Sequence, residues 1–257
     1  MTIDIENLEA GYHGRAVLKP FTTQLCGAGI TALIGANGAG KSTLLRTISG
    51  AQPPVGGSVS IDSRKLGSIP PKELARCISL VYTDRASAGD LTVEEVAALG
   101  RQPYTGMFGR LDADDRAIVA EALAAVGIND MRRRKLATLS DGERQKTMIA
   151  RALAQATPIM ILDEPTSFLD AASRIEVMQL LARLRDEMGK TIILSTHDIA
   201  PAMAVADNLW VADRTTGSID SGRRDDVVAR GTMDRVFANT AVRFDSTAGD
   251  YRMIRTI

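Results

Sequence analysis

The chain has 257 residues, with 31 basic and 31 acidic side chains and 45% hydrophobic residues. A chain of this length can bury one large hydrophobic core, or one core plus a small subdomain. The zero net charge argues against a broad basic surface, so nucleic acid is not expected as a partner. The only cysteines, Cys26 and Cys77, form no CxxC pair, which favours a reducing cytoplasm over a disulfide scaffold. The acidic N-terminus does not resemble a signal peptide, and no apolar run approaches the ~20 residues that span a bilayer, so a membrane role would require a partner.

Strand patterns begin at the N-terminus. Residues 1–30 and 57–61 read as short alternating strands with turn residues, which predicts an antiparallel sheet beside the main one. The main sheet is predicted from short apolar runs that are rich in β-branched residues, because such runs suit parallel strands buried on both faces. These runs are residues 30–34, 78–82, 159–162, 191–195 and 208–212.

Helical patterns lie between the apolar runs. Residues 114–126 carry apolar side chains at helical spacing and end at Gly127, a typical helix terminus. Residues 173–188 show the same spacing and stop at Gly189. The alternation of strands and helices predicts an α/β layered fold.

Two regions depart from this alternation. Residues from about 85 to 155 are mostly helical and too long for one crossover, so we expect them to form an inserted helical subdomain. Residues 214–257 are polar and turn-rich with short strand-like pieces, and we expect a short C-terminal extension there. The whole of residues 1–257 is otherwise expected to form a single domain.

A phosphate-binding pattern, G-x-x-x-x-G-K-S, occupies Gly35 to Ser42, after a predicted strand and at the start of a predicted helix. Its glycines allow backbone amides to turn inward around phosphate oxygens, and the helix N-terminus adds a favourable dipole. Lys41 is expected to reach the β- and γ-phosphates, and the Ser42 hydroxyl to ligate Mg²⁺. The other residues expected to bind nucleotide here are Asn37, Gly38, Gly40 and Thr43.

Two acids follow the buried strand IMIL. Asp163 offers a carboxylate that can hold Mg²⁺ through water, and Glu164 could polarise an attacking water. Taken alone, two acids at a strand end are common caps. Their combination with the phosphate loop favours a catalytic site.

His197 ends the next apolar strand, in TIILSTHD. A lone histidine after a strand is more often structural. A position at the end of an adjacent parallel strand instead favours a contact with the γ-phosphate and the attacking water.

The stretch LSDGERQ, residues 139–145, contains a capping box, Ser140-x-x-Glu143, in which both side chains satisfy free amides at a helix start. Taken with GANGAGKS, ILDEP, SFLD and STHD in this order, it resembles the ATP-binding subunits of ABC transporters over roughly residues 3–240. The resemblance implies the fold of a phosphate-loop NTPase of the ABC type, a single nucleotide-binding domain, and ATP hydrolysis with Mg²⁺.

The resemblance also implies a second copy of the chain. Ser140 and Gly142 would contact the γ-phosphate held by Lys41 of that copy, and the capping role of Ser140 is compatible with this contact. Tyr12 would stack on adenine, with a plain strand-edge aromatic as the alternative. Asp170 would cross the dimer interface, and it could equally cap the helix that begins near residue 173.

Two departures from the family pattern affect the expected site. Thr83 stands where the family places a glutamine that contacts Mg²⁺, so a direct metal contact by this residue is in doubt. Asp141 and Glu143 stand where glycine and glutamine are usual. These acids would weaken nucleotide-driven closure unless they point away or are neutralised by Arg144 or Lys146.

Residues 90–106, with GR-x-PY at residues 100–104, resemble a segment of importers for iron-siderophores, heme and cobalamin. The expected partners are therefore permease subunits and, indirectly, an extracytoplasmic substrate-binding protein, with the chain peripheral on the cytoplasmic face of the membrane. The alternative is a soluble ABC scaffold ATPase, such as a component of iron–sulfur cluster assembly.

Overall fold

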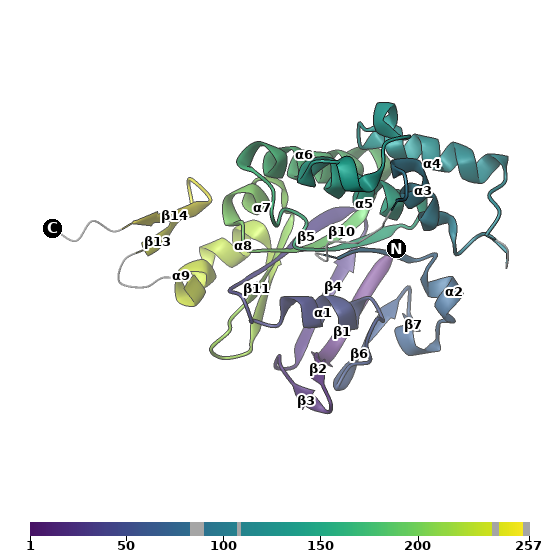
Figure 1. The fold of residues 1–257 in the computed structure, drawn as a ribbon. Coiled ribbons are helices and arrows are strands. Elements are labelled where there is room, and N and C mark those ends of the chain that lie inside the picture. The colour runs from purple at the N-terminus through teal and green to yellow at the C-terminus, as the bar shows by residue number, and fades with distance from the viewer. Residues whose placement is uncertain (83–89, 107–108, 238–241, 254–257) are drawn as a thin grey trace.

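The computed structural model describes residues 1–82, 90–106, 109–237 and 242–253. A six-stranded sheet with the strand order β12-β11-β5-β10-β9-β8 forms the centre of the molecule (Figure 1). All neighbouring strands of this sheet pair in parallel except β11 and β12. The five parallel strands are β5 (Gly29–Gly35), β8 (Ile78–Val81), β9 (Ile159–Asp163), β10 (Thr191–Thr196) and β11 (Asn208–Ala212).

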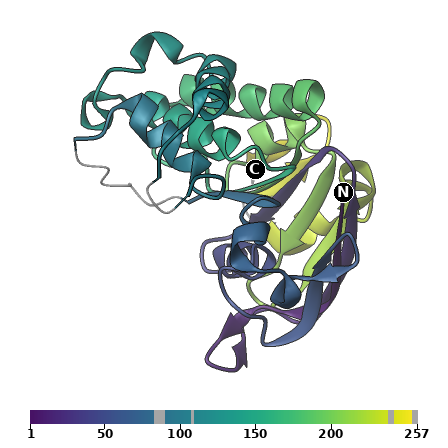
Figure 2. The same ribbon diagram turned by 90° about the vertical axis from the view of Figure 1, so that its right-hand side faces the viewer.

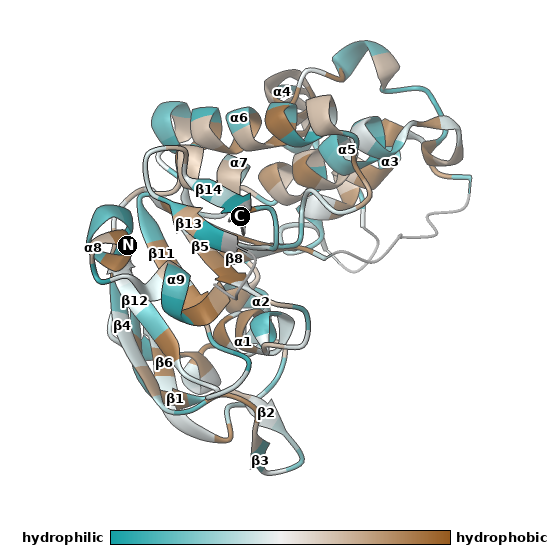
Figure 3. Ribbon diagram, turned by 90° about the vertical axis from the view of Figure 1, so that its left-hand side faces the viewer, coloured by the Kyte–Doolittle hydropathy of each residue, from teal (hydrophilic) through white to brown (hydrophobic). Residues whose placement is uncertain are grey.

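These five strands confirm the predicted apolar runs, with ends that differ by one residue at most. Every residue of β9 and of β10 is buried, as expected for strands covered on both faces. Hydrophobic residues follow β5 and β11 through the middle of the fold (Figure 3). The mainly parallel core sheet that the sequence predicts is therefore present.

A second, antiparallel sheet has the order β4-β1-β6-β7 and confirms the prediction for the N-terminal region. Its strands are β1 (Thr2–Glu9), β4 (Phe21–Cys26), β6 (Gly56–Ile61) and β7 (Arg64–Lys65), and β2 (Gly11–Tyr12) pairs with β3 (Arg15–Ala16) beside it. One hydrophobic core joins this sheet to helix α1 (Lys41–Ile48) and to one face of the central sheet. Within that core Phe21 and Trp210 meet edge to face, with ring centroids 5.3 Å apart.

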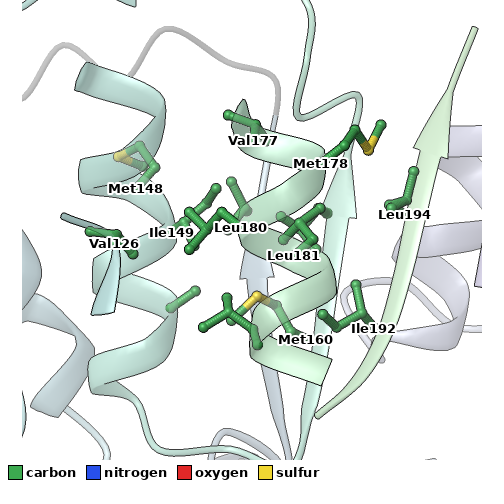
Figure 4. Close-up of a cluster of buried hydrophobic side chains, with 14 of the residues drawn as sticks. Val126, Met148, Ile149, Met160, Val177, Met178, Leu180, Leu181, Ile192 and Leu194 are labelled. Atoms are coloured by element: carbon green, nitrogen blue, oxygen red, sulfur yellow. The ribbon is translucent and has the colours of Figure 1, made fainter. Parts of the chain in front are cut away.

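The other face of the central sheet is covered by helices. Figure 4 shows Ile149 of α5 (Asp141–Ala154) and Leu180 and Leu181 of α6 (Ala171–Met188) gathered over Met160 and Ile192 of the sheet. Helix α7 (Ile199–Val205) packs beside α6. A continuous apolar core therefore links the sheet to these helices.

Helices α3 (Val93–Ala98), α4 (Ala113–Ala125) and α5 pack on one another, and the teal segments of Figure 2 show them as a group at one side of the central sheet. The predicted helix at residues 114–126 is confirmed as α4, which begins after the capping residue Asp112 and is followed by Gly127 at φ 74°. Helix α6 confirms the other predicted helix, and Gly189 ends it at φ 61°. The division of the chain into one domain with an inserted helical subdomain stays a prediction.

The C-terminal region contains more regular structure than its polar composition suggests. Strand β12 (Ile219–Arg223) extends the central sheet, and β13 (Val242–Asp245) pairs with β14 (Asp250–Met253). Helices α8 (Arg224–Ala229) and α9 (Thr232–Phe237) were not predicted, because six residues are too few to display a helical period. The remaining helix, α2 (Pro71–Leu74), precedes β8. Among the described residues, no helix combines the length and the apolar character needed to cross a bilayer.

Candidate functional site

The loop between β5 and α1 brings a helix N-terminus to the carboxyl edge of the central sheet. Gly38 and Gly40 adopt φ values of 80° and 88°, which residues with a side chain rarely adopt. A Cβ atom on Gly40 would also lie 3.0 Å from Cγ of Leu18. The backbone thus curves back tightly before α1, and the positive end of the helix dipole faces the concave side of the loop.

The Lys41 side chain is buried beneath this loop, with only 6% of its surface exposed. Its ammonium donates to the carbonyl oxygens of Gly35 and Ala36, at 2.8 and 3.5 Å, and lies 3.2 Å from Oε1 of Glu164. These contacts hold a cation at the floor of the loop, where an anion bound by the loop amides would meet it.

The end of β9 meets the end of β10 directly beside the loop. Asp163 of β9 pairs in register with Ser195 of β10, and the Ser195 hydroxyl donates to the buried Asp163 carboxylate at 2.5 Å. Ser195 was not predicted as a site residue, because only the strand register brings it opposite Asp163. The hydrogen bond orients one carboxylate oxygen of Asp163.

Glu164 lies between two basic side chains. Its carboxylate is 3.2 Å from Nζ of Lys41 through Oε1 and 2.6 Å from Nδ1 of His197 through Oε2. Its backbone has a φ of 51° and its amide donates to the main-chain oxygen and to the hydroxyl of Ser195, at 3.1 and 2.9 Å. A non-glycine residue with positive φ is uncommon, and clustered hydrogen bonds of this kind maintain it. The Glu164 side chain is only 13% exposed, whereas that of His197 is 49% exposed.

These groups border a cleft of about 820 Å³. Tyr12 lies at its rim with 43% of its surface exposed, and its phenol oxygen accepts a hydrogen bond from the Thr43 hydroxyl at 3.1 Å. An exposed aromatic ring at the rim of a phosphate-binding cleft is suited to stacking on a nucleobase. The predicted site residues that line the cleft are Tyr12, Asn37, Gly38, Gly40, Lys41, Ser42, Thr43, Glu164 and His197.

Of the other predicted nucleotide ligands, Gly35 ends β5 and accepts from the Lys41 ammonium, and Ser140, Gly142 and Asp170 lie away from the cleft. Ser140 caps α5 and forms the complete capping box with Glu143. The Ser140 amide donates to Oε2 of Glu143 at 2.8 Å, and the Glu143 amide donates to Oγ of Ser140 at 3.3 Å. Asp170 caps α6 by accepting from the Ser173 amide at 2.9 Å. A Cβ atom on Gly142 would lie 3.0 Å from Oγ of Ser173, so the first turns of α5 and α6 are in contact. Neither Ser140, Gly142 nor Asp170 lines the cleft of its own chain.

The two acids next to Ser140 are paired within the chain. Glu143 forms the capping box and lies 3.4 Å from Arg134, and the hydrogen bond from the Ser140 amide is the main reason that its pKa is lowered. Asp141 lies 3.6 Å from Arg144. Lys146, considered above as a neutralising group, instead pairs with Glu176 at 2.7 Å. The negative charge at the start of α5 is thus balanced by Arg134 and Arg144.

Arg174, which was not predicted, also lines the cleft. Its guanidinium lies 3.1 Å from Asp198, which in turn accepts from the Thr166 hydroxyl at 2.9 Å. Asp198 is the last residue of the STHD motif, directly after His197, so the motif itself pointed to Asp198 as a site residue. Asp198 thus ties the loop after β10 both to α6, through Arg174, and to the loop after β9, through Thr166.

The oxygen ligands expected for Mg²⁺ fit this arrangement in part. Mg²⁺ is usually held by one or two protein oxygens together with phosphate oxygens and water, and the Asp163 carboxylate and Ser42 hydroxyl are groups of that kind on the two sides of the site. Thr83, the third predicted metal contact, lies outside the described residues.

Comparison with known proteins was consistent with this geometry. Residues 18–167 match the family model described as ABC transporter. An uncharacterized ABC transporter ATP-binding protein of Methanocaldococcus jannaschii is 44% identical over 204 residues, covering 79% of this chain and 70% of that protein. The ferric enterobactin transport ATP-binding protein FepC of Escherichia coli is 37% identical over 232 residues, covering 90% of this chain and 85% of that protein.

Solved structures agree in fold. A metal-chelate type ABC transporter in an inward-facing conformation superposes with a TM-score of 0.82 at 24% identity, covering 98% of this chain and 95% of that chain. A dimeric bacterial ABC transporter cassette superposes with a TM-score of 0.73 at 28% identity, covering 86% of this chain and 98% of that chain. On these matches the chain belongs to the ABC transporter family and is an ATP-binding subunit with ATPase activity.

Proposed function

We propose that this ATPase subunit powers a membrane importer for a metal chelate of the iron-siderophore, heme or cobalamin type, with Mg²⁺ as the cofactor of hydrolysis. The observation that carries the ATPase part is the position of Glu164, held between Lys41 and His197 at the inner end of the nucleotide cleft. The cargo class is supported by the likeness to the ferric enterobactin subunit and by the GR-x-PY segment.

In the proposed mechanism, the amides of residues 36–40 and the Lys41 ammonium bind the phosphates, and Tyr12 stacks on adenine. Glu164 orients a water molecule for in-line attack on the γ-phosphate and accepts its proton. His197 holds the Glu164 carboxylate in place through Nδ1. Ser42 and Asp163 would hold Mg²⁺, the latter through water, and the bound ion would neutralise negative charge on the phosphates.

The proposal includes a second copy of the chain. Ser140 and Gly142 sit at the N-terminus of the 14-residue helix α5 and lie outside the cleft of their own chain. The Ser140 amide is bound by Glu143, so the groups offered to a phosphate held by another copy are the Ser140 hydroxyl and the Gly142 amide. The likeness to a dimeric cassette supports such a pairing. Two Mg-ATP molecules would then lie between two chains, each bound by Lys41 of one chain and by Ser140 of the other.

ATP binding and hydrolysis would close and open this dimer, and the helices α3 to α5 would pass the motion to permease subunits in the membrane. Nucleotide shifts the populations of two states, so the direction of transport would come from the permease. We place the subunit on the cytoplasmic face, with an extracytoplasmic substrate-binding protein as an indirect partner.

The experiment that tests this proposal is an affinity pull-down of the chain from detergent-solubilised membranes, with the co-purifying proteins identified by mass spectrometry. A polytopic membrane protein in stoichiometric amount is the expected result. If a preparation that still hydrolyses ATP holds only soluble partners, the importer proposal is wrong and the soluble scaffold ATPase takes its place.

A further inference from the structure

The GR-x-PY segment at residues 100–104 does not line the nucleotide cleft, yet its residues make close contacts with α4, with the end of α5 and with Arg76. A Cβ atom on Gly100 would lie 2.2 Å from the carbonyl oxygen of Arg151 and 3.0 Å from the amide of Gln155. The segment is therefore pressed against the C-terminal end of α5, where only glycine fits.

Arg101 is the buried member of this segment, with 5% of its surface exposed. It donates through Nε to Asp115 at 2.8 Å and through Nη1 to the carbonyl oxygen of Ala154 at 2.9 Å. The last carbonyl oxygens of a helix have no partner within the helix, and a cation near them is favourable. Arg101 thus satisfies the end of α5 and connects it to Asp115 of α4.

Tyr104 connects the same helix end to Arg76, in the segment that precedes β8. Its hydroxyl donates to the carbonyl oxygen of Gln155 at 3.0 Å, and its ring centroid lies 4.0 Å from Cζ of Arg101 and 4.8 Å from Cζ of Arg76. Arg76, which lies between α2 and β8, also donates to the carbonyl oxygen of Pro103 through Nε and Nη2, at 3.2 and 3.0 Å. Two cations on one aromatic ring thus join the helical group to the segment that precedes β8.

Two further side chains fix the same helix end directly to the edge of the sheet. Gln155 donates to the carbonyl oxygens of Ala75 and Ile78, at 2.6 and 2.9 Å, and Arg151 donates to that of Leu80 at 3.0 Å. The C-terminal end of α5 is therefore held by contacts to α4, to the segment before β8 and to β8 itself.

The opposite end of α5 carries Ser140 and Gly142. A 14-residue helix is about 21 Å long, so a rotation of about 3° about its fixed end moves the other end by about 1 Å. Displacements of that size in a catalytic contact are costly. The angle at which α5 leaves the core therefore controls where its first turn meets a phosphate.

We propose that Arg76, Arg101 and Tyr104 are positioning residues that set the tilt of α5, so that Ser140 and Gly142 reach the nucleotide bound by a second copy. This inference rests on the proposed dimer of the preceding section. It assigns to the GR-x-PY segment a role in closure of the dimer rather than in nucleotide binding by one chain.

Arg76 is the best residue for a test, because it is exposed and lies outside α5 and outside the cleft. In full-length chains that carry Glu164→Gln, we would add Arg76→Ala or Tyr104→Phe and measure ATP-driven dimerisation by sedimentation velocity. The matched control is Arg116→Ala, an exposed arginine on α4 that has no ion pair among the described residues. A fluorescent ATP analogue would report binding to single chains, and thermal melting would report folding.

We expect Arg76→Ala to weaken the ATP-driven dimer by about tenfold or more, because a displacement of about 1 Å at the first turn of α5 is costly for its contact with the phosphate. Nucleotide binding by the single chain, the melting temperature and the Arg116→Ala control should stay unchanged. Arg76→Lys keeps a cation and one donor, so it should restore part of the loss. Tyr104→Phe keeps the ring and loses only the contact to Gln155, so a smaller weakening is expected.

If Arg76→Ala and Tyr104→Phe dimerise as tightly as Glu164→Gln alone, the positioning role is wrong. The positioning role is also wrong if Arg76→Ala lowers both the dimer affinity and the melting temperature, and Arg76→Lys restores neither of them. The segment would then only support the fold. If Glu164→Gln itself binds ATP without dimerising, the proposed dimer fails, and this inference fails with it for a different reason.

Discussion

Glu164 forms an ion pair with Lys41, at 3.2 Å, in a cleft whose loop is suited to bind phosphate. The residue proposed as the general base is thus held by the residue proposed to bind the γ-phosphate. Phosphate oxygens compete with the Glu164 carboxylate for the Lys41 ammonium, so nucleotide binding would leave Glu164 with His197 as its main partner. The base would become available to water only when its substrate is present.

Glu164→Gln should lower the turnover number by about 10²- to 10⁴-fold, the usual contribution of general-base catalysis, while ATP binding persists. The amide keeps the size of the side chain and cannot accept a proton from water. ATP should therefore accumulate in a trapped dimer, which size-exclusion chromatography with bound-nucleotide analysis would measure. Glu121→Gln, an exposed glutamate on α4, serves as the control. Turnover at the wild-type rate would contradict the assignment of the base.

His197→Ala should reduce the turnover number by about 10- to 100-fold with little change in KM for ATP, because a hydrogen bond to a charged carboxylate is lost. Steady-state ATPase kinetics would measure both constants. The other histidine provides the control as His13→Asn, since asparagine tolerates the φ of 50° at that position. A lower melting temperature with an unchanged turnover number would indicate a structural histidine instead.

Tyr12→Ala should raise the Kd for ATP by about 5- to 150-fold, because stacking of a base on an aromatic ring contributes roughly 1–3 kcal/mol. Tyr12→Phe keeps the ring and loses only the contact to Thr43, so its Kd should stay within about twofold of the wild type. Isothermal titration calorimetry on the three proteins would measure the difference. Equal Kd values for all three would mean that Tyr12 is a strand-edge aromatic without a role in adenine binding.

Gly142→Ala tests the contact between the first turns of α5 and α6. Alanine favours a helix interior over glycine by about 1 kcal/mol, so helix propensity alone predicts a more stable protein. The new Cβ atom would instead lie 3.0 Å from Oγ of Ser173, which is held by Asp170 at 3.1 Å, and we expect a net loss of stability.

Ser173→Ala removes that oxygen, so it should partly relieve the cost of Gly142→Ala. Urea unfolding of the two single variants and the double variant would give the interaction free energy between positions 142 and 173, which we expect to be roughly 1 kcal/mol. Strictly additive effects would show that the two helix starts do not constrain each other.

Asp115→Asn should alter the pH dependence of stability. The hydrogen bond from Arg101 lowers the pKa of the Asp115 carboxyl, so the native state binds fewer protons here than the unfolded chain. The stabilisation is complete above the unfolded pKa of about 3.9 and is lost as the pH falls through the lower native pKa. The free energy of unfolding of the wild type should therefore exceed that of Asp115→Asn most at pH 7. The difference between the two proteins should become smaller as the pH falls.

Urea unfolding between pH 7 and pH 3 would measure this gap. Asp114→Asn is the matched control, because Asp114 is the exposed acid in the same first turn of α4 and has no ion pair among the described residues. If both variants lose the same unfolding free energy relative to the wild type, or if the loss for Asp115→Asn grows in acid, the role of the Arg101–Asp115 pair is contradicted.

Features that depend on neighbouring residues could be predicted from the sequence. The phosphate loop, the capping box at Ser140 and the helix end at Gly189 each arise from local backbone preferences, and the structure contains them within a residue of the expected place. The five parallel strands could be predicted for the same reason, because a strand that is buried on both faces consists of consecutive apolar residues. The short helices α8 and α9 have no such period, and they escaped prediction.

Contacts between distant segments required the tertiary structure. Asp163 and Ser195 are 32 residues apart, and the parallel register of β9 and β10 alone puts their side chains within 2.5 Å. Arg76, Arg101 and Gln155 likewise all contact Tyr104 only because α5 returns to the edge of β8. The sequence alone determined where strands end, where helices begin and which polar residues lie at those points, since these features follow from local backbone geometry. Which of them touch was decided by strand register and helix packing, since these depend on contacts between segments far apart in the chain.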